Sequence, residues 1–106
     1  MFKTRITWPT AEQAYADAPS ILSEIGWTAR TLAALECFTE LDRDFYLRKA
    51  ALLDRIALLD EPDAPGEITE TAVAAALHLI DTDQADVTGD PRAYVRRHYA
   101  YWARNN

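Results

Sequence analysis

The sequence predicts an all-α fold, a compact bundle of four to five helices with a short extended N-terminal arm. Apolar residues recur at spacings of three and four through most of the chain after residue 10. Side chains that cap helix N-termini precede these stretches. Only the first eight residues show a different, two-residue alternation. We therefore expect one extended segment followed by helices alone.

Length and composition limit the class of protein. The 106 residues are about half apolar and predict a single domain over residues 1–106. The one cysteine excludes a disulfide framework and any cysteine-based zinc site. No apolar run approaches the roughly 20 residues of a membrane-spanning helix, and the N-terminus does not resemble a signal peptide. We expect a cytoplasmic protein that does not enter a membrane.

The extended arm covers residues 1–9. Phe2, Ile6 and Trp8 share one parity, polar residues occupy the other, and Pro9 ends the segment. A lone strand cannot pair its own backbone groups. The arm is therefore expected either to lie over the helices or to pair with a second chain.

Two helices are expected between residues 10 and 36. Thr10 and Gln13 form a capping-box pattern, which predicts a short helix to about Asp17. Ser20 is the expected cap of the second helix. Its expected buried positions are spaced by three and four and are Ile21, Ile25, Ala29, Leu32 and then Leu35 or Glu36.

The third helix is the clearest in the sequence. It begins after a cap within Thr39–Asp42 or continues from the second helix, and it ends near Asp60 because Pro and Gly follow. Two apolar rows indicate a central helix with neighbours on two sides. The first row is Phe38, Leu41, Phe45, Leu52, Ile56 and Leu59, and the second is Leu47, Ala51 and Leu58. Asp44 and Arg48 are expected to pair within this helix.

Two further helices are expected after residue 66. Thr69 is the expected cap of the fourth helix, which buries Val73, Ala76, Leu77 and Ile80. Asp90 and Pro91 are typical of a cap followed by a first helical residue, and they begin a terminal helix over residues 91–106. Its apolar rows are Val95, Tyr99 and Trp102, and next to them Tyr94, His98 and Tyr101.

The net charge of −6 is distributed unevenly. Residues 1–90 hold seven cations and all 17 acids, a sum of −10, whereas residues 91–106 hold four arginines and no acid, a sum of +4. Three interpretations of the basic, aromatic terminal helix stay open. It packs on the acidic body and pairs with its carboxylates, it forms a partner-binding face, or it binds nucleic acid through arginine and stacked aromatics.

Assembled catalytic or metal-binding patterns are not found in the sequence. The acidic stretch Asp81–Asp90 fails the calcium-loop pattern because Ala85, Asp86 and Arg92 stand where a ligand oxygen, the glycine and the terminal glutamate are required. No glycine-rich phosphate loop occurs, since the three glycines lie far apart. We therefore predict no catalytic residues, no metal and no cofactor.

The sequence favours a small non-enzymatic interaction module, an adaptor or regulator that self-associates as a homodimer. The alternative is a nucleic-acid-directed regulator, which either binds through the terminal helix or inhibits a nucleic-acid-binding protein as an acidic mimic. An enzyme with a small cavity between helices is a third hypothesis, for which a histidine in contact with a carboxylate would be required. The candidate partner-binding residues are Phe2, Ile6, Trp8, Arg96, Arg97, Tyr101 and Trp102.

Overall fold

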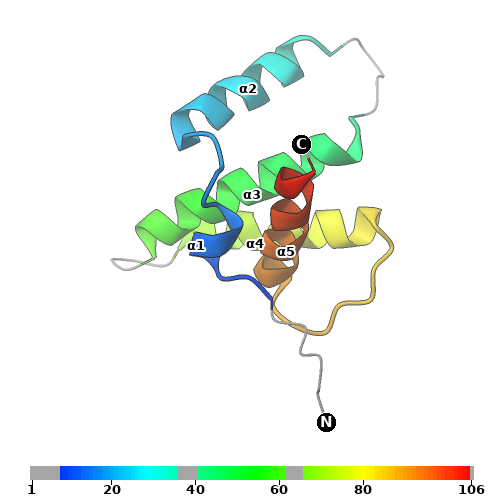
Figure 1. Cartoon of the computed structure of the whole chain (residues 1–106). Helices are drawn as coiled ribbons and strands as arrows, with labels where there is room; N and C mark the ends of the chain where they lie inside the picture. Colours follow the sequence, from blue (N-terminus) through cyan, green and yellow to red (C-terminus); the bar gives the residue numbers. More distant parts are fainter. Residues whose placement is uncertain (1–7, 36–40, 62–65, 106) are drawn as a thin grey trace.

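Five helices make up the described part of the chain, which comprises residues 8–35, 41–61 and 66–105 of this computed structural model (Figure 1). They are α1 (Ala11–Ala14), α2 (Ile21–Ala33), α3 (Arg43–Asp60), α4 (Glu67–Thr82) and α5 (Pro91–Arg104). No strand occurs within the described ranges, and the all-α prediction is confirmed. Residues 1–7 of the expected arm lie outside the described residues.

Local capping explains where most of the helices begin. The Thr10–Gln13 capping box is present, and the Ser20 hydroxyl accepts the amide of Ser23. Asp42 accepts the amide of Phe45 at 3.0 Å and begins α3. The α1 helix is shorter than predicted, because it ends at Ala14 rather than near residue 17.

The fourth helix begins earlier than the sequence predicts. Gly66 is its N-cap, without a side-chain hydrogen bond, and Thr69 lies inside the first turn. The Thr69 hydroxyl donates instead to Glu61 at 2.8 Å. Its buried face also differs from the prediction, since Leu79 is fully buried and Leu77 is half exposed. The sequence holds apolar residues on both sides of this helix, so periodicity alone does not select the buried one.

The core lies where α3, α4 and α5 meet. Helices α3 and α4 run side by side, and α5 crosses them both (Figure 1). Aliphatic residues of α3 and α4 pack there against two tyrosines and a valine of α5. By helix, the core residues are Leu47, Ala50 and Ala51; Ala76, Leu79 and Ile80; Tyr94, Val95 and Tyr99. The second predicted row of α3 thus contributes Leu47 and Ala51. Leu59, assigned to the first row, is 71 % exposed near the end of the helix.

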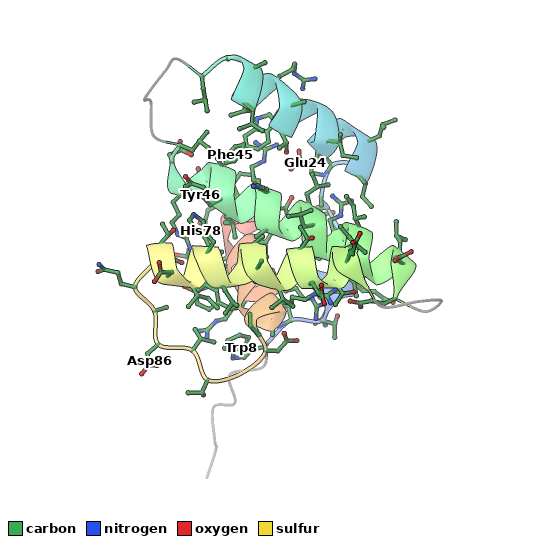
Figure 2. All side chains as sticks on the ribbon, turned by 180° about the vertical axis from the view of Figure 1, so that it is seen from behind. Trp8, Glu24, Phe45, Tyr46, His78 and Asp86 are labelled. Carbon is green, nitrogen blue, oxygen red and sulfur yellow. The ribbon has the colours of Figure 1, made fainter. Side chains whose placement is uncertain are left out.

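Helix α2 packs mainly against α3, along the edge of the molecule (Figure 1). Buried Glu24 receives two hydrogen bonds from Arg48, at 3.1 and 2.6 Å. The Arg48 guanidinium also lies 3.5 Å from the centre of the Trp27 ring, and Trp27 packs on Phe45. Figure 2 shows Glu24 and Phe45 between the two helices. The predicted Asp44–Arg48 pair is therefore replaced by a pair between helices.

The buried face predicted for α2 is wrong. Glu24 is buried, whereas Ile25, Ala29 and Leu32 are exposed. The physical reason is that the bidentate Glu24–Arg48 pair and the stacked Trp27 fix a different face on α3. A charge-assisted pair with fixed geometry orients a helix more strictly than a few apolar contacts do.

Candidate functional site

The terminal helix α5 is packed on the body of the protein. Tyr94, Val95 and Tyr99 are buried in the core, and Arg92 is buried with them. Tyr101 is 69 % exposed on the outer side. The first interpretation of this helix, in which it packs and pairs with acids of the body, therefore describes most of its length.

Asp54 of α3 pairs with two of the four arginines of this helix. Its side chain is fully buried and accepts four side-chain hydrogen bonds. Arg92 donates through Nε at 2.5 Å, and Arg96 donates through Nε and Nη2 at 2.8 and 2.9 Å. The Tyr15 hydroxyl donates the fourth, at 2.7 Å. Arg96, a candidate partner-binding residue, is thus engaged inside the chain.

Burial alone would raise the pKa of Asp54, but the hydrogen bonds from Arg96, Tyr15 and Arg92 outweigh it and hold that pKa below its ordinary value. Arg92 also pairs with Glu61, which accepts from Thr69. We call Asp54, Tyr15, Arg92, Arg96, Glu61 and Thr69 the Asp54 cluster. It links the C-cap of α1, α3, the segment after α3, α4 and α5 through side-chain hydrogen bonds and ion pairs.

The sequence analysis did not identify Asp54, although its position carried a signal. It lies three residues after Ala51 and four before Leu58, within the apolar row that begins at Leu47. An acid inside a buried row requires cationic partners. The four arginines of residues 91–106, a segment without acids, are the cations that the sequence offers as partners.

A pocket of about 560 Å³ lies between Trp8, the loop before α5 and the first turns of α5. Trp8 is 38 % exposed, and the Arg97 guanidinium lies 4.9 Å from the centre of its ring. Ala85, Val87 and Ala93 contribute an apolar lining. Figure 2 shows Trp8 and Asp86 on this side of the molecule. We call this hollow the Trp8–Arg97 pocket.

The loop of this pocket is held at both ends. At its start, Gln84 has a φ of +54°, and the amides of Gln84 and Ala85 bond to the carbonyls of Asp81 and Ile80. These two bonds form a Schellman motif, which closes α4 without a glycine. At its end, Asp90 accepts the amide of Arg92 at 3.0 Å, as predicted. The pocket is therefore preformed on its loop side.

Tyr94 of the pocket lining takes part in a polar network with residues outside that lining. The Tyr94 hydroxyl donates to Asp83 at 2.6 Å, and Arg43 binds the same carboxylate at 2.6 and 2.8 Å. Arg43 Nη2 also lies 3.2 Å from His98 Nδ1. Burial and the hydrogen bond to the Asp83 carboxylate raise the pKa of Tyr94 to about 12.

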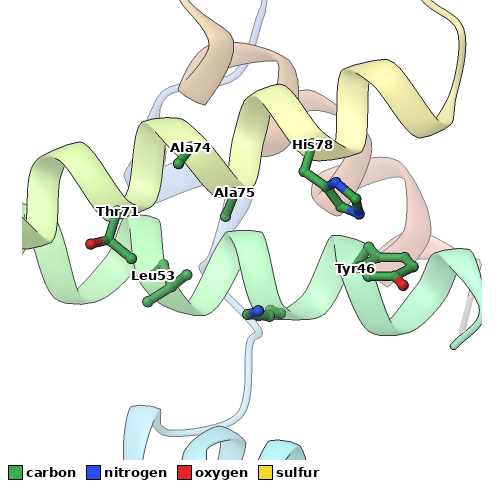
Figure 3. A pocket seen from close by; sticks show the side chains of 7 residues that line it. Tyr46, Leu53, Thr71, Ala74, Ala75 and His78 are labelled. Atoms are coloured by element: carbon green, nitrogen blue, oxygen red, sulfur yellow. The ribbon is translucent and has the colours of Figure 1, made fainter.

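A smaller groove of about 340 Å³ runs between α3 and α4 (Figure 3). Ala74, Ala75 and Leu53 provide its apolar floor, and the rings of Tyr46 and His78 meet edge to face at 4.8 Å at one end. No carboxylate is among the seven residues that line it. The histidine–carboxylate pair required by the enzyme hypothesis is thus not found in this groove.

The structure brings two of the predicted partner-binding residues together. Trp8 and Arg97 line one pocket although 89 positions separate them in the sequence (97 − 8). Tyr101 lies exposed elsewhere on α5, and Trp102 packs at 5.4 Å on Tyr99. Phe2 and Ile6 lie outside the described residues. The pocket residues of the loop, such as Val87, were not identified from the sequence, because an apolar residue in a polar loop is a weak signal.

Comparisons of the chain with known protein families, with curated proteins and with solved structures found no match. No helix in the described part of the chain is long and apolar enough to cross a membrane. Within the same ranges, no group of three or more histidine, cysteine or acidic side chains is placed to hold a metal ion. The candidate site is therefore defined by its geometry alone.

Proposed function

We propose that this protein is a non-enzymatic interaction module that binds a partner protein through the Trp8–Arg97 pocket. The observation that carries the proposal is the stacked pair itself. An exposed tryptophan and an exposed arginine, drawn from opposite ends of the chain, border a preformed pocket with an apolar lining. Tryptophan and arginine are enriched among the residues that dominate binding energy at protein interfaces.

The chemistry of the pocket defines the partner. The apolar lining and the Trp8 ring suit a large aliphatic or aromatic side chain. Within the described part of the chain, Arg97 forms no ion pair and its guanidinium contacts the Trp8 ring. Its guanidinium is thus available to a carboxylate of the partner. The expected ligand is a protein segment that places an apolar side chain in the pocket and an acid at Arg97, the one cation of a lining that also holds Asp86 and Asp90.

The nucleic-acid alternative is less well supported by the arrangement of charge. Arg92 and Arg96 are engaged with Asp54, which leaves Arg97 and Arg104 as the exposed arginines of α5. Two cations on a chain of net charge −6 neutralise few phosphates. Binding to DNA or RNA in a gel shift at low salt would overturn this preference.

Site-specific photo-crosslinking in cells of the native host tests the proposal. A photo-reactive amino acid replaces Val87 in the pocket, and in a control chain it replaces Leu59, which is exposed on α3. The proposal predicts a cross-linked protein at position 87 that is absent at position 59. Equal products at both positions, or none at position 87, would refute it.

Calorimetry with the purified cross-linked partner then measures the role of the stacked pair. Arg97→Ala should weaken binding about tenfold or more, the range of a hot-spot residue. Arg104→Ala is the matched control, because it removes an exposed arginine of the same helix that does not line the pocket. Equal affinities of the two variants would contradict the proposal.

Self-association through the arm stays a separate prediction, since Phe2 and Ile6 lie outside the described residues. Deletion of residues 1–8 should lower the molar mass measured by light scattering if the arm pairs or exchanges between two copies. A full-length chain that is monomeric would contradict this prediction without affecting the pocket.

A further inference from the structure

Helix α2 carries an apolar row that the rest of the described chain leaves uncovered. Leu22 is 79 % exposed, Ile25 43 % and Leu32 48 %, and Ala29 is exposed between them. The spacing of three, four and three places all four on one side of the helix. We call Leu22, Ile25, Ala29 and Leu32 the α2 seam.

The seam lies about a third of a turn around the helix from the face that docks on α3. That docking face holds Glu24, Trp27 and Thr28, which are buried or half buried. Because the Glu24–Arg48 pair fixes this orientation, the seam points away from α3. Figure 1 shows α2 at the outer edge of the molecule, where a second body can reach it.

We propose that the α2 seam is a self-association surface, on which α2 of one copy packs antiparallel on α2 of a second copy. The seam is complementary to itself in this arrangement. With the twofold axis at position 27, Ile25 of one copy faces Ala29 of the other, and Leu22 faces Leu32. Large residues then meet small ones at the centre, and leucines pair at both ends. A twofold interface requires this kind of self-complementarity.

Charge also favours a second copy at this helix. Two chains of net charge −6 repel each other. The only acid of α2 is Glu24, which is buried and paired with Arg48. The one cation of α2, Arg30, lies beside the seam, with Nη1 3.0 Å from the place that a Cβ on Gly26 would take. The seam residues themselves are uncharged, so no acidic side chains of α2 face each other when two α2 helices meet.

The size of the seam sets the expected strength. Its side chains expose roughly 300–400 Å² of apolar surface per copy, the size of a functional patch on a small protein. Two such patches bury less than the roughly 1,200 Å² of a standard stable interface. The dimer is therefore expected to dissociate on dilution, with a mass that rises from 12.0 kDa toward twice that value as concentration increases.

Sedimentation equilibrium of the full chain over a wide concentration range tests the inference. Ile25→Asp should remove the concentration dependence and leave a monomer, whereas Leu59→Asp should not, although Leu59 is more exposed. Circular dichroism reports whether each variant folds. Monomeric wild-type protein up to about 1 mM, or equal self-association of the two variants, would overturn the proposal.

A complementation experiment at the two ends of the seam tests the antiparallel register. Leu22→Lys and Leu32→Glu should each be monomeric. In a symmetric dimer of either variant, a charged side chain would face a leucine at both ends of the seam. In a mixture of the two, Lys at 22 faces Glu at 32 and the remaining leucines pair, so association should return to within about tenfold of wild type. A mixture that stays monomeric refutes this register.

The inference is independent of the Trp8–Arg97 pocket and of the arm. Trp8→Ala and Arg97→Ala should leave the sedimentation profile unchanged. Association that is lost on deletion of residues 1–8 but kept in Ile25→Asp would assign the dimer to the arm instead.

Discussion

The Asp54 cluster makes the sharpest prediction about stability. Asp54→Asn removes a fully buried charge with little change in volume, and its amide keeps one acceptor oxygen where the carboxylate had two. Four hydrogen bonds at 2.5 to 2.9 Å are disturbed. Arg92 and Arg96, whose side chains are only 9 % and 17 % exposed, are left close together with their shared charge removed.

Breaking one side of a buried pair costs about 3–5 kcal/mol, mostly because the remaining charges are uncompensated. Glu61 still pairs with Arg92, so we expect the lower end, about 3 kcal/mol. A loss of about 1 kcal/mol lowers the thermal unfolding midpoint of a domain of this size by about 4–8 °C, so the midpoint of Asp54→Asn should fall by at least roughly 12 °C.

Urea unfolding followed by circular dichroism and tryptophan fluorescence measures the change. Asp44→Asn is the matched control, an exposed acid on the same helix, and it should cost less than about 0.5 kcal/mol. A loss below about 1 kcal/mol for Asp54→Asn, with an unchanged urea dependence, would show that the cluster does not hold the bundle together. A double-mutant cycle with Arg96→Gln should give a large coupling free energy.

Three further predictions concern local structure and pH. Glu24→Gln should speed amide hydrogen exchange in α2 about tenfold or more and leave α4 unchanged, since the pair with Arg48 is the main polar tie of α2; equal acceleration in both helices would contradict this. Asp90→Ala should cost about 1 kcal/mol through loss of the α5 cap, measured by urea unfolding, and no loss would argue against the cap. Burial and Arg43 lower the pKa of His98, and the pKa of Asp54 is also lowered. Each group therefore contributes stability at a pH above its pKa in the unfolded chain, and this contribution is lost as the pH falls through its pKa in the folded protein. Stability should therefore decline slightly as pH falls below about 6.5 and steeply below about 4, and His98→Gln should abolish only the first decline.

The parts of the fold that depend on local sequence could be predicted. The Thr10, Ser20 and Asp90 caps act on amides two or three residues away, and each is found in the structure. The end of α3 at Asp60 also follows from the proline and glycine after it. These features need no knowledge of what the helix packs against.

The parts that depend on tertiary partners could not. The α2 seam has the spacing of a buried face, yet the choice of face is made by Arg48, 24 residues away from Glu24. Arg96 has the same composition signal as Arg97, but only Arg97 lies in the pocket, because Asp54 captures the other. Periodicity shows that a helix has an apolar side and not which partner covers it.

The Asp54 cluster also determines how much of the chain must be synthesised before the core can form. The arginines that neutralise Asp54 and the residues Val95 and Tyr99 of the core all belong to α5. A nascent chain that ends before Pro91 carries an acid on the inner face of α3 with neither its cations nor its apolar cover. Such a chain cannot complete its core, so folding waits until the terminal helix has left the ribosome, and fragments released early remain open to proteolysis. Folding of the preceding helices thus depends on the synthesis of α5.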